Sequence, residues 1–247
     1  MPNLGFLRAS VATLFITLYC GVYALVGTFL KKDRETLDRN SRRWAAGILR
    51  ACRISVDLVG AEHLPKGAAI LVGNHQGMLD ILALMATLPE PPVFAAKAEL
   101  FKIPIFGQAM RVLGHIPIHR GNRQKAIASI NKGAKKLQKT GHQLAFFPEG
   151  TRSRDGEIHA FKKGAFMFAL ESQLPLIPFA INGSFQCCPP AKNKVYAGVI
   201  QLRILPPVDL SPYNRDNRDE LIDSVRSDIV SAVRLQNHRR AQLKTRR

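Results

Sequence analysis

The seven residues NHQGMLD, at positions 74–80, place a histidine and a carboxylate close together directly after an apolar run. A histidine beside a carboxylate can act as a general base, because the carboxylate orients the imidazole and stabilises its protonated form. His75 and Asp80 are five positions apart, whereas neighbours on one helix face are three or four apart. The pair must therefore meet across an irregular turn, which Gly77 can supply at little steric cost. A surface histidine beside a helix start is the alternative.

A second polar cluster is FFPEGTRSRDG, residues 146–156, where an apolar segment gives way to proline, glutamate, glycine and arginine. In α/β sheets, ligands bind beyond the carboxyl ends of strands, and glycine lets the backbone approach a ligand closely. Arg152 offers a planar fork that matches phosphate. The cluster predicts a phosphate site, with an ordinary turn and a solvated arginine as the alternative.

A third cluster is LGHIPIHRGNR, residues 113–123. Arg120 ends a short strand there, and the next helical pattern begins at Asn122. A guanidinium and a helix N-terminus can bind one phosphate together, so Arg120 is a second candidate phosphate ligand. His115 and His119 lie on the same strand, and we assign them no chemistry.

The segments that carry these clusters alternate between strand-like and helix-like patterns from residue 54 onward. This alternation predicts an α/β layer fold in which helices cover a sheet. A helix with an apolar face and exposed lysines is expected at 122–140, and another after an N-cap at Asn217. The predicted strands are residues 54–60, 68–73, 92–100, 115–120, 144–150, 174–183 and 196–205.

The N-terminal region carries a membrane signal. Ala9–Leu30 contains no charged residue and is close to the ~20 residues that a helix needs to cross a bilayer. A signal peptide fits less well, because the apolar run is long and no small-residue cleavage site follows it. Basic residues are dense between Lys31 and Arg43, so the positive-inside rule places the downstream domain in the cytoplasm. A spanning helix and a helix within one leaflet fit this composition equally.

A second helix is predicted directly after this apolar segment. Its apolar residues share one side and its arginines surround the rest, as is typical of a helix at an anionic membrane surface. Packing of that side on the soluble domain is the alternative. We therefore expect a membrane-anchoring helix pair at 1–53 and an α/β domain at 54–247. The apolar residues are Leu37, Trp44, Ile48, Leu49 and Cys52, and the arginines are Arg39, Arg42, Arg43, Arg50 and Arg53.

The charge of the chain indicates an anionic partner. There are 36 Lys and Arg against 18 Asp and Glu, with a net charge of +18 and a pI near 10.3. Nucleic acid and acidic lipid both fit this charge, but no nucleic-acid-binding signature is present. The four cysteines, Cys20, Cys52, Cys187 and Cys188, form neither a zinc spacing nor a secreted disulfide framework, which favours a reducing cytosol.

Taken together, these clusters resemble the motifs of the 1-acylglycerol-3-phosphate acyltransferase family. The first family motif, asparagine-histidine-x4-aspartate, matches residues 74–80, and the second, a glycine-led strand ending in arginine, matches 114–120. The third, phenylalanine-proline-glutamate-glycine-threonine-arginine, is present letter for letter at 147–152. The fourth, an apolar-proline-apolar strand, matches 177–179.

The chain departs from the family at two positions. An acidic residue is common where this chain has His119, and serine is common where it has Gly77. The change at Gly77 bears on the geometry of the junction and on substrate preference. Lys97, in FAAKAEL, resembles a family lysine near the acceptor phosphate.

The resemblance implies the glycerolipid acyltransferase fold, a mixed sheet covered by helices, and acyl transfer to the sn-2 hydroxyl of 1-acylglycerol-3-phosphate. His75 would be the general base and Asp80 its partner. A thiol with a pKa of about 8.5 is a good leaving group, so no covalent enzyme intermediate is required. No metal and no cofactor are expected. The residues assigned to the acceptor phosphate are Arg120, Arg152 and Lys97, and those assigned to the substrate pocket are Glu149, Gly150 and Thr151.

The resemblance also implies the partners and the location of the protein. The donor would be acyl-CoA or acyl-carrier protein, the acceptor lysophosphatidic acid, and the surface an anionic phospholipid membrane, with no nucleic acid. The catalytic domain would lie on the cytoplasmic side of the inner cell membrane. A glycerol-3-phosphate acyltransferase is one alternative. A non-catalytic lipid-phosphate-binding module is the other, and it would not need His75 and Asp80.

Overall fold

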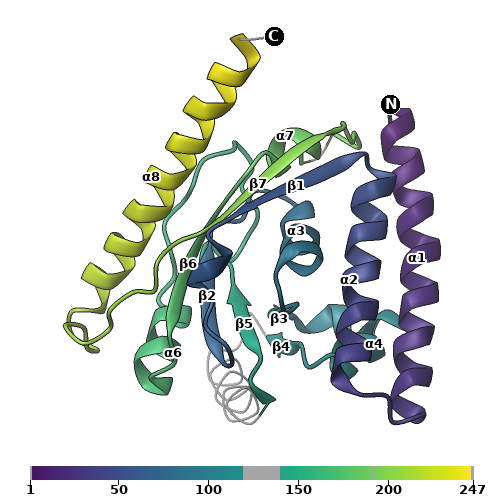
Figure 1. Cartoon of the computed structure of the whole chain (residues 1–247), viewed down its shortest axis with the longest axis horizontal. Helices are drawn as coiled ribbons and strands as arrows, with labels where there is room; N and C mark the ends of the chain where they lie inside the picture. The colour runs from purple at the N-terminus through teal and green to yellow at the C-terminus, as the bar shows by residue number, and fades with distance from the viewer. Residues whose placement is uncertain (1, 119–139, 191, 246–247) are drawn as a thin grey trace.

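The computed structural model describes residues 2–118, 140–190 and 192–245, and within them it contains a seven-stranded mixed sheet (Figure 1). The strand order is β1-β7-β6-β2-β5-β3-β4. Six of the seven predicted strand segments contain one of these strands whole, and the segment predicted at 144–150 overlaps β5, which begins one residue earlier, so the predicted fold class is confirmed. Their bounds are β1 Ile54–Val59, β2 Ala69–Gly73, β3 Val93–Lys97, β4 Ile116–Ile118, β5 Gln143–Phe146, β6 Leu176–Asn182 and β7 Gly198–Ile204.

Five neighbouring strands run in one direction and so share a carboxyl edge. β2 is parallel to β5 and β6, and β3 is parallel to β4 and β5, whereas β7 is antiparallel to β6 and parallel to β1. Every residue of β2 and β6 is buried, as expected for continuous apolar runs at the centre of a sheet covered on both faces. The residues that follow β2, β5 and β6 therefore meet at one edge, together with the end of β3.

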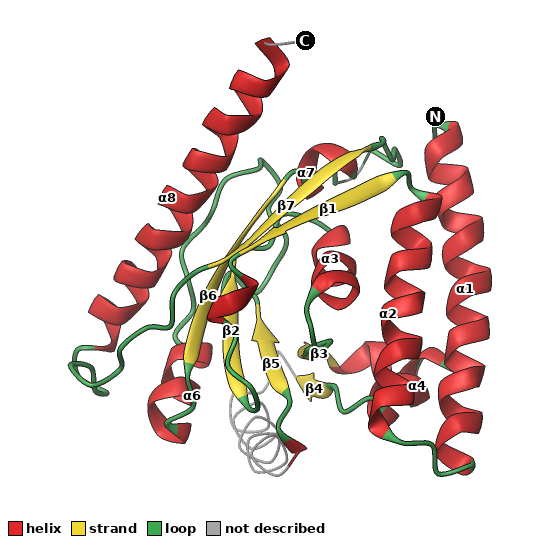
Figure 2. Ribbon diagram, in the orientation of Figure 1, coloured by secondary structure: helices red, strands yellow, loops and turns green. Residues whose placement is uncertain are grey.

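Helices cover both faces of the sheet (Figure 2). Leu71 of β2 belongs to a hydrophobic core shared with α2 and α3, whereas its neighbours Ile70 and Val72 belong to a second core shared with α6 and α8. This alternation follows from the two-residue period of a strand. The helices are α1 Leu4–Phe29, α2 Arg34–Ala51, α3 Leu79–Thr87, α4 Phe106–Val112, α6 Gly164–Ser172, α7 Ser184–Cys187 and α8 Arg218–Thr245, and the 3-10 turns are η1 Ala61–His63 and η2 Ala98–Lys102.

Two predicted helix features have different outcomes. The helix predicted at 122–140 lies, except for Thr140, outside the described residues. The C-terminal helix begins at Arg218, directly after the predicted N-cap. However, the side-chain oxygen of Asn217 accepts a hydrogen bond from the Asn214 N–H (2.7 Å), so it stabilises the preceding turn.

α1 and α2 form an antiparallel pair along one side of the molecule (Figure 1). The Asn40 side chain donates to the Cys20 carbonyl oxygen (2.8 Å), and the Trp44 Nε1 donates to the Thr17 hydroxyl (2.9 Å). The expectation that the apolar side of α2 faces lipid is wrong. Ile48 and Leu49 are buried in the same core as α3 and the sheet, because α2 lies between α1 and α3 and is enclosed by both.

Candidate active site

His75 and Asp80 meet across the junction between β2 and α3, as predicted. The His75 Nδ1 lies 2.8 Å from the Asp80 Oδ2, and the imidazole stacks on the Phe147 ring with centroids 4.0 Å apart. Asp80 is fully buried, whereas the His75 side chain is 14% exposed. With Nδ1 bound to the carboxylate, Nε2 is the nitrogen left to exchange a proton with a ligand.

Three residues, two from the junction and one from α7, supply the partners of the Asp80 carboxylate. Its Oδ2 also accepts from the Gly77 N–H (2.8 Å), and its Oδ1 accepts from the Ser184 hydroxyl at the start of α7. The turn does not require glycine, because the nearest atom to an added Cβ at position 77 would be 3.5 Å away. Ser184 could not be identified as a site residue from the sequence, because it lies 104 positions from Asp80 and beyond the last recognised motif.

Asn74 fixes the start of the same junction. Its side-chain amide donates to the Ile181 carbonyl oxygen and accepts from the Ile181 N–H, both at 2.8 Å. Asn74 is fully buried, and the paired bonds continue the contact between β2 and β6 beyond the end of the strand. Gly73 is needed just before it, since a Cβ there would lie 2.2 Å from the Phe179 ring.

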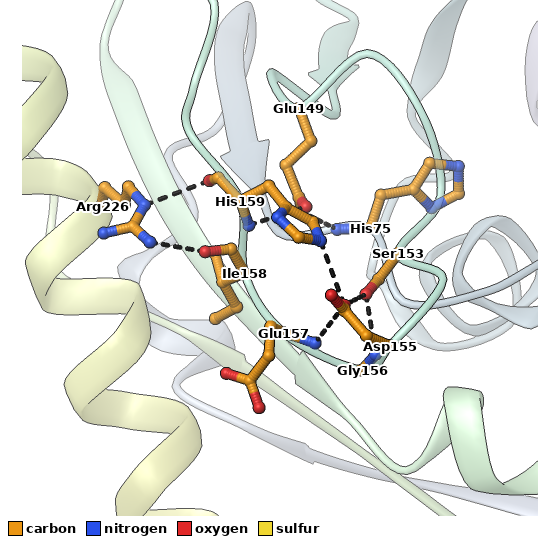
Figure 3. A network of polar contacts seen from close by, with 9 residues as sticks. All are labelled: His75, Glu149, Ser153, Asp155, Gly156, Glu157, Ile158, His159 and Arg226. Carbon is orange, nitrogen blue, oxygen red and sulfur yellow. Dashed lines mark hydrogen bonds and ion pairs between the residues drawn. The ribbon is translucent and has the colours of Figure 1, made fainter.

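Glu149 binds the backbone on both sides of the site (Figure 3). One carboxylate oxygen accepts from the His75 N–H (2.7 Å) and the other from the His159 N–H (3.1 Å). Burial raises the pKa of Glu149, and the two backbone N–H groups oppose that rise. The carboxylate assigned to the substrate pocket thus holds the protein backbone.

The loop after Glu149 carries the remaining polar residues of the third motif. Gly150 adopts the left-handed region (φ 72°), and an added Cβ would lie 2.6 Å from the Lys162 Nζ. Thr151 and Arg152 are exposed beyond it. The Ser153 N–H donates to the His75 carbonyl oxygen (2.8 Å), so this loop is bound directly to the junction between β2 and α3.

The other two predicted phosphate ligands are Lys97 and Arg120, and two histidines lie near Arg120 in the sequence. Lys97 ends β3 at the same edge of the sheet and lies 3.8 Å from a Glu99 carboxylate oxygen. Arg120 and His119 lie outside the described residues. His115 accepts a hydrogen bond from the Phe94 N–H (3.0 Å), and burial lowers the pKa of its imidazole to about 4, in keeping with a structural role.

A family model described as Acyltransferase matches residues 55–182. The chain belongs to this acyltransferase family. A 1-acyl-sn-glycerol-3-phosphate acyltransferase from Saccharomyces cerevisiae is 30% identical over 91% of this chain and 76% of its own length. The Mus musculus 1-acyl-sn-glycerol-3-phosphate acyltransferase alpha is 35% identical over 73% of this chain, which spans 64% of that protein.

A solved member of the acyltransferase family has the same fold. The 1-acyl-sn-glycerophosphate (LPA) acyltransferase PlsC from Thermotoga maritima has a TM-score of 0.79 and 27% identity, over 94% of this chain and 95% of that one. The family resemblance inferred from the four motifs is thereby confirmed. Among the described residues, no group of three or more His, Cys, Asp or Glu side chains is arranged to hold a metal ion.

Proposed function

We propose that the protein transfers an acyl group from a thioester to the sn-2 hydroxyl of 1-acylglycerol-3-phosphate, forming phosphatidic acid. The observation that carries the proposal is the His75–Asp80 pair at the carboxyl edge of the sheet, in which the buried Asp80 carboxylate orients the His75 imidazole. The names of the yeast, mouse and Thermotoga relatives support this choice of acceptor. Acyl-CoA and acyl-carrier protein both fit as the donor.

The geometry of the pair suits direct transfer. The His75 Nε2 removes the hydroxyl proton while the hydroxyl oxygen attacks the thioester carbonyl carbon, forming the new C–O bond. Collapse of the tetrahedral intermediate breaks the C–S bond, and His75 returns its proton to the departing thiolate. Asp80 stabilises the imidazolium between these steps. The same histidine therefore serves as base and then as acid.

Cations at the sheet edge are proposed to hold the acceptor phosphate. Arg152 is exposed on the loop that binds the His75 backbone, and Lys97 lies at the end of a neighbouring strand. Arg120, outside the described residues, stays in this proposal because of its motif. Gly150 and Thr151 are proposed to line the pocket, whereas the Glu149 carboxylate holds the backbone of the site.

α1 is proposed to dock the enzyme on the cytoplasmic side of an anionic membrane. In the described part of the chain it is the one helix long and apolar enough to cross a bilayer. One flank of α1 contacts α2 and α4, however, so lipid cannot surround it. The helix therefore fits within one leaflet, with its free flank in the acyl region. Arg43 and Arg50 on α2 and Arg53 just after it are exposed and can meet anionic headgroups.

Product analysis with defined substrates tests the proposal. Lysophosphatidic acid, glycerol 3-phosphate and lysophosphatidylcholine would be offered with acyl-CoA or acyl-carrier protein, and thiol release and lipid product would be measured. We expect phosphatidic acid from lysophosphatidic acid. Product from glycerol 3-phosphate alone would replace this function with that of a glycerol-3-phosphate acyltransferase. A failure to acylate any of the acceptors would refute enzymatic acyl transfer.

The histidine variant provides the mechanistic test. His75→Ala should lower kcat by about 100- to 10,000-fold, the usual contribution of general acid–base catalysis. Asp80→Asn should also lose most activity, because it removes the charge that stabilises the imidazolium. A thermal melt would check that His75→Ala is folded. Near wild-type turnover by folded His75→Ala would end the general-base role.

A further inference from the structure

The loop between the third motif and α6 is bound at its far end by α8 (Figure 3). The Arg226 Nε donates to the His159 carbonyl oxygen (3.1 Å), and an Arg226 Nη2 donates to the Ile158 carbonyl oxygen. One guanidinium thus holds two consecutive peptide groups. Arg226 lies 68 positions from Ile158 and outside every motif recognised in the sequence.

The same peptide segment faces the catalytic junction from its other side. The His159 N–H donates to the Glu149 Oε2 (3.1 Å), and the Glu149 Oε1 accepts from the His75 N–H (2.7 Å). Hydrogen bonds therefore run without a break from Arg226 to the backbone of His75. Figure 3 shows these groups in line between α8 and the histidine.

Glu149 is a buried carboxylate that depends on its hydrogen-bond partners. It is 4% exposed, and each of its oxygens accepts one backbone N–H. A buried carboxylate that loses a donor is strongly disfavoured, because water does not replace the lost bond. Displacement of the 158–159 segment would therefore disturb Glu149 and, through it, the His75 backbone.

α8 is a rigid support for this contact. Leu221, Val225 and Ile229 of this helix are fully buried, so the helix position is fixed by the core. Arginine suits the task, because its planar guanidinium presents several N–H donors in a fixed fork, whereas the lysine ammonium is a single point on a flexible stem.

We propose that Arg226 is a positioning residue for the catalytic histidine: it holds residues 158–159 so that Glu149 fixes the backbone of His75. This deepens the proposed acyl transfer and rests on it. The ring of His159 takes no part in this series of hydrogen bonds, since it pairs with the Asp155 carboxylate (3.0 Å) at the surface. His159→Ala keeps the backbone N–H and separates the two contributions.

Kinetics of matched arginine variants form the first test. Arg226→Ala should lower kcat by about 10- to 100-fold, the effect expected when a small displacement misplaces a catalytic group, with the acceptor KM within about twofold. Arg226→Lys should recover only part of this loss. Arg234→Ala is the control, because Arg234 is exposed on the same helix, and it should match the wild type. His159→Ala should retain most activity.

The pH profile is a readout that a general loss of stability would not move. Burial raises the pKa of Glu149, and the His159 N–H opposes this, so loss of that bond should raise the pKa further. His75 and His159 are the titratable groups whose charges reach Glu149. Protonation of Glu149 should then begin at higher pH, and the acid limb of kcat should shift upward in Arg226→Ala relative to Arg234→Ala.

Amide hydrogen exchange tests the series of hydrogen bonds from Arg226 to His75 without any substrate. In Arg226→Ala the amides of His159 and His75 should exchange faster than in the wild type and in Arg234→Ala. Unchanged protection of both amides, or a kcat within twofold of wild type, would overturn the proposal. Activity that falls only with the folded fraction of both Arg226 variants would also overturn it. If the wild type fails to acylate lysophosphatidic acid, the proposed function fails, while the exchange data still test the hydrogen bonds from Arg226 to His75.

Discussion

At the scale of single residues, the junction between β2 and α3 depends on one buried carboxylate shared by three donors. His75, Gly77 and Ser184 each contribute one hydrogen bond to Asp80, from the junction itself and from α7. A buried charge is stable only when such partners surround it. The orientation of the imidazole therefore depends on residues outside the motif that contains it.

Ser184→Ala should reduce activity by removing one donor from the Asp80 carboxylate. Hydrogen bonds to charged groups contribute roughly 1.5–3 kcal/mol, so we expect kcat to fall about 10-fold or more. The acceptor KM should change little, because the hydroxyl contacts Asp80 on the buried side of the pair. Steady-state kinetics per folded molecule measure the effect. Ser184→Thr keeps the hydroxyl and should restore most activity; a threonine variant as impaired as alanine would argue against this role.

Arg152→Ala should weaken acceptor binding. Loss of a charge-assisted contact to phosphate is expected to raise the acceptor KM roughly 10- to 100-fold, and lysine should recover only part of this because it lacks the bidentate fork. Acceptor saturation curves provide the measurement. Arg154, exposed two positions further on, is the matched control. A weakened donor response with an unchanged acceptor response would reassign Arg152 to the donor.

At the scale of elements, α1 differs from the other helices of the described residues in the apolar surface that it leaves exposed. Twelve large apolar residues between positions 4 and 30 are exposed, including Phe15 at 66% and Phe29 at 87%. Exposed apolar surface of this extent marks an interaction site. The arginine side of α2 also has a structural role, since Arg42 donates to the carbonyl oxygens of Leu88 and Pro89, directly after α3.

Charged substitutions on the free flank of α1 should release the protein from vesicles. Each large apolar side chain contributes roughly 1.5–3 kcal/mol when buried in lipid, so Leu14→Glu with Leu18→Glu should lower vesicle affinity more than about 100-fold. Both residues are exposed, at 56% and 41%, so the fold should survive. Leu235→Glu on α8 is the control, since Leu235 is also exposed (57%) but lies far from α1 in sequence. Vesicle flotation decides the matter, and unchanged binding would withdraw the anchor role of α1.

At the scale of the whole molecule, the helix pair and the α/β layers share a hydrophobic core. Ala9 of α1 and Ile48 of α2 belong to the same cluster as Leu71 of β2 and Ile177 of β6. The Arg8 side chain also donates to the Ala51 carbonyl oxygen at the end of α2 (2.6 Å). The division of the chain at residue 53 stays a prediction, and the shared core argues against independent folding of its two parts.

Deletion of residues 1–53 should therefore leave a chain that does not fold stably. Ile48 and Leu49 are nearly fully buried, and each such side chain contributes roughly 1.5–3 kcal/mol, a large part of a net stability of about 5–15 kcal/mol. The truncated chain should aggregate or lack a cooperative thermal transition. A soluble truncated protein that melts near the wild-type temperature would establish residues 54–247 as an independent domain.

The sequence by itself determined the local features of this protein. The seven strands, the strand-to-helix junction at NHQGMLD and the apolar N-terminal helix follow from patterns within short segments. Such patterns are informative because the period of apolar residues and the turn residues at each end act over a few neighbouring positions. The His75–Asp80 contact could be predicted for the same reason, since the two residues are five positions apart in one strand-to-helix junction.

Only the tertiary structure decided which distant groups complete the site. Ser184 and Asp80 are 104 positions apart, and Glu149 accepts a hydrogen bond from the N–H of His75, 74 positions away. These contacts exist because β2, β5 and β6 are parallel neighbours whose carboxyl ends meet, and strand order is not written in the pattern of any one strand. The apolar side of α2 is likewise suited to lipid and to protein. The presence of α3 beneath it decided the outcome, because burial depends on what the rest of the chain places there.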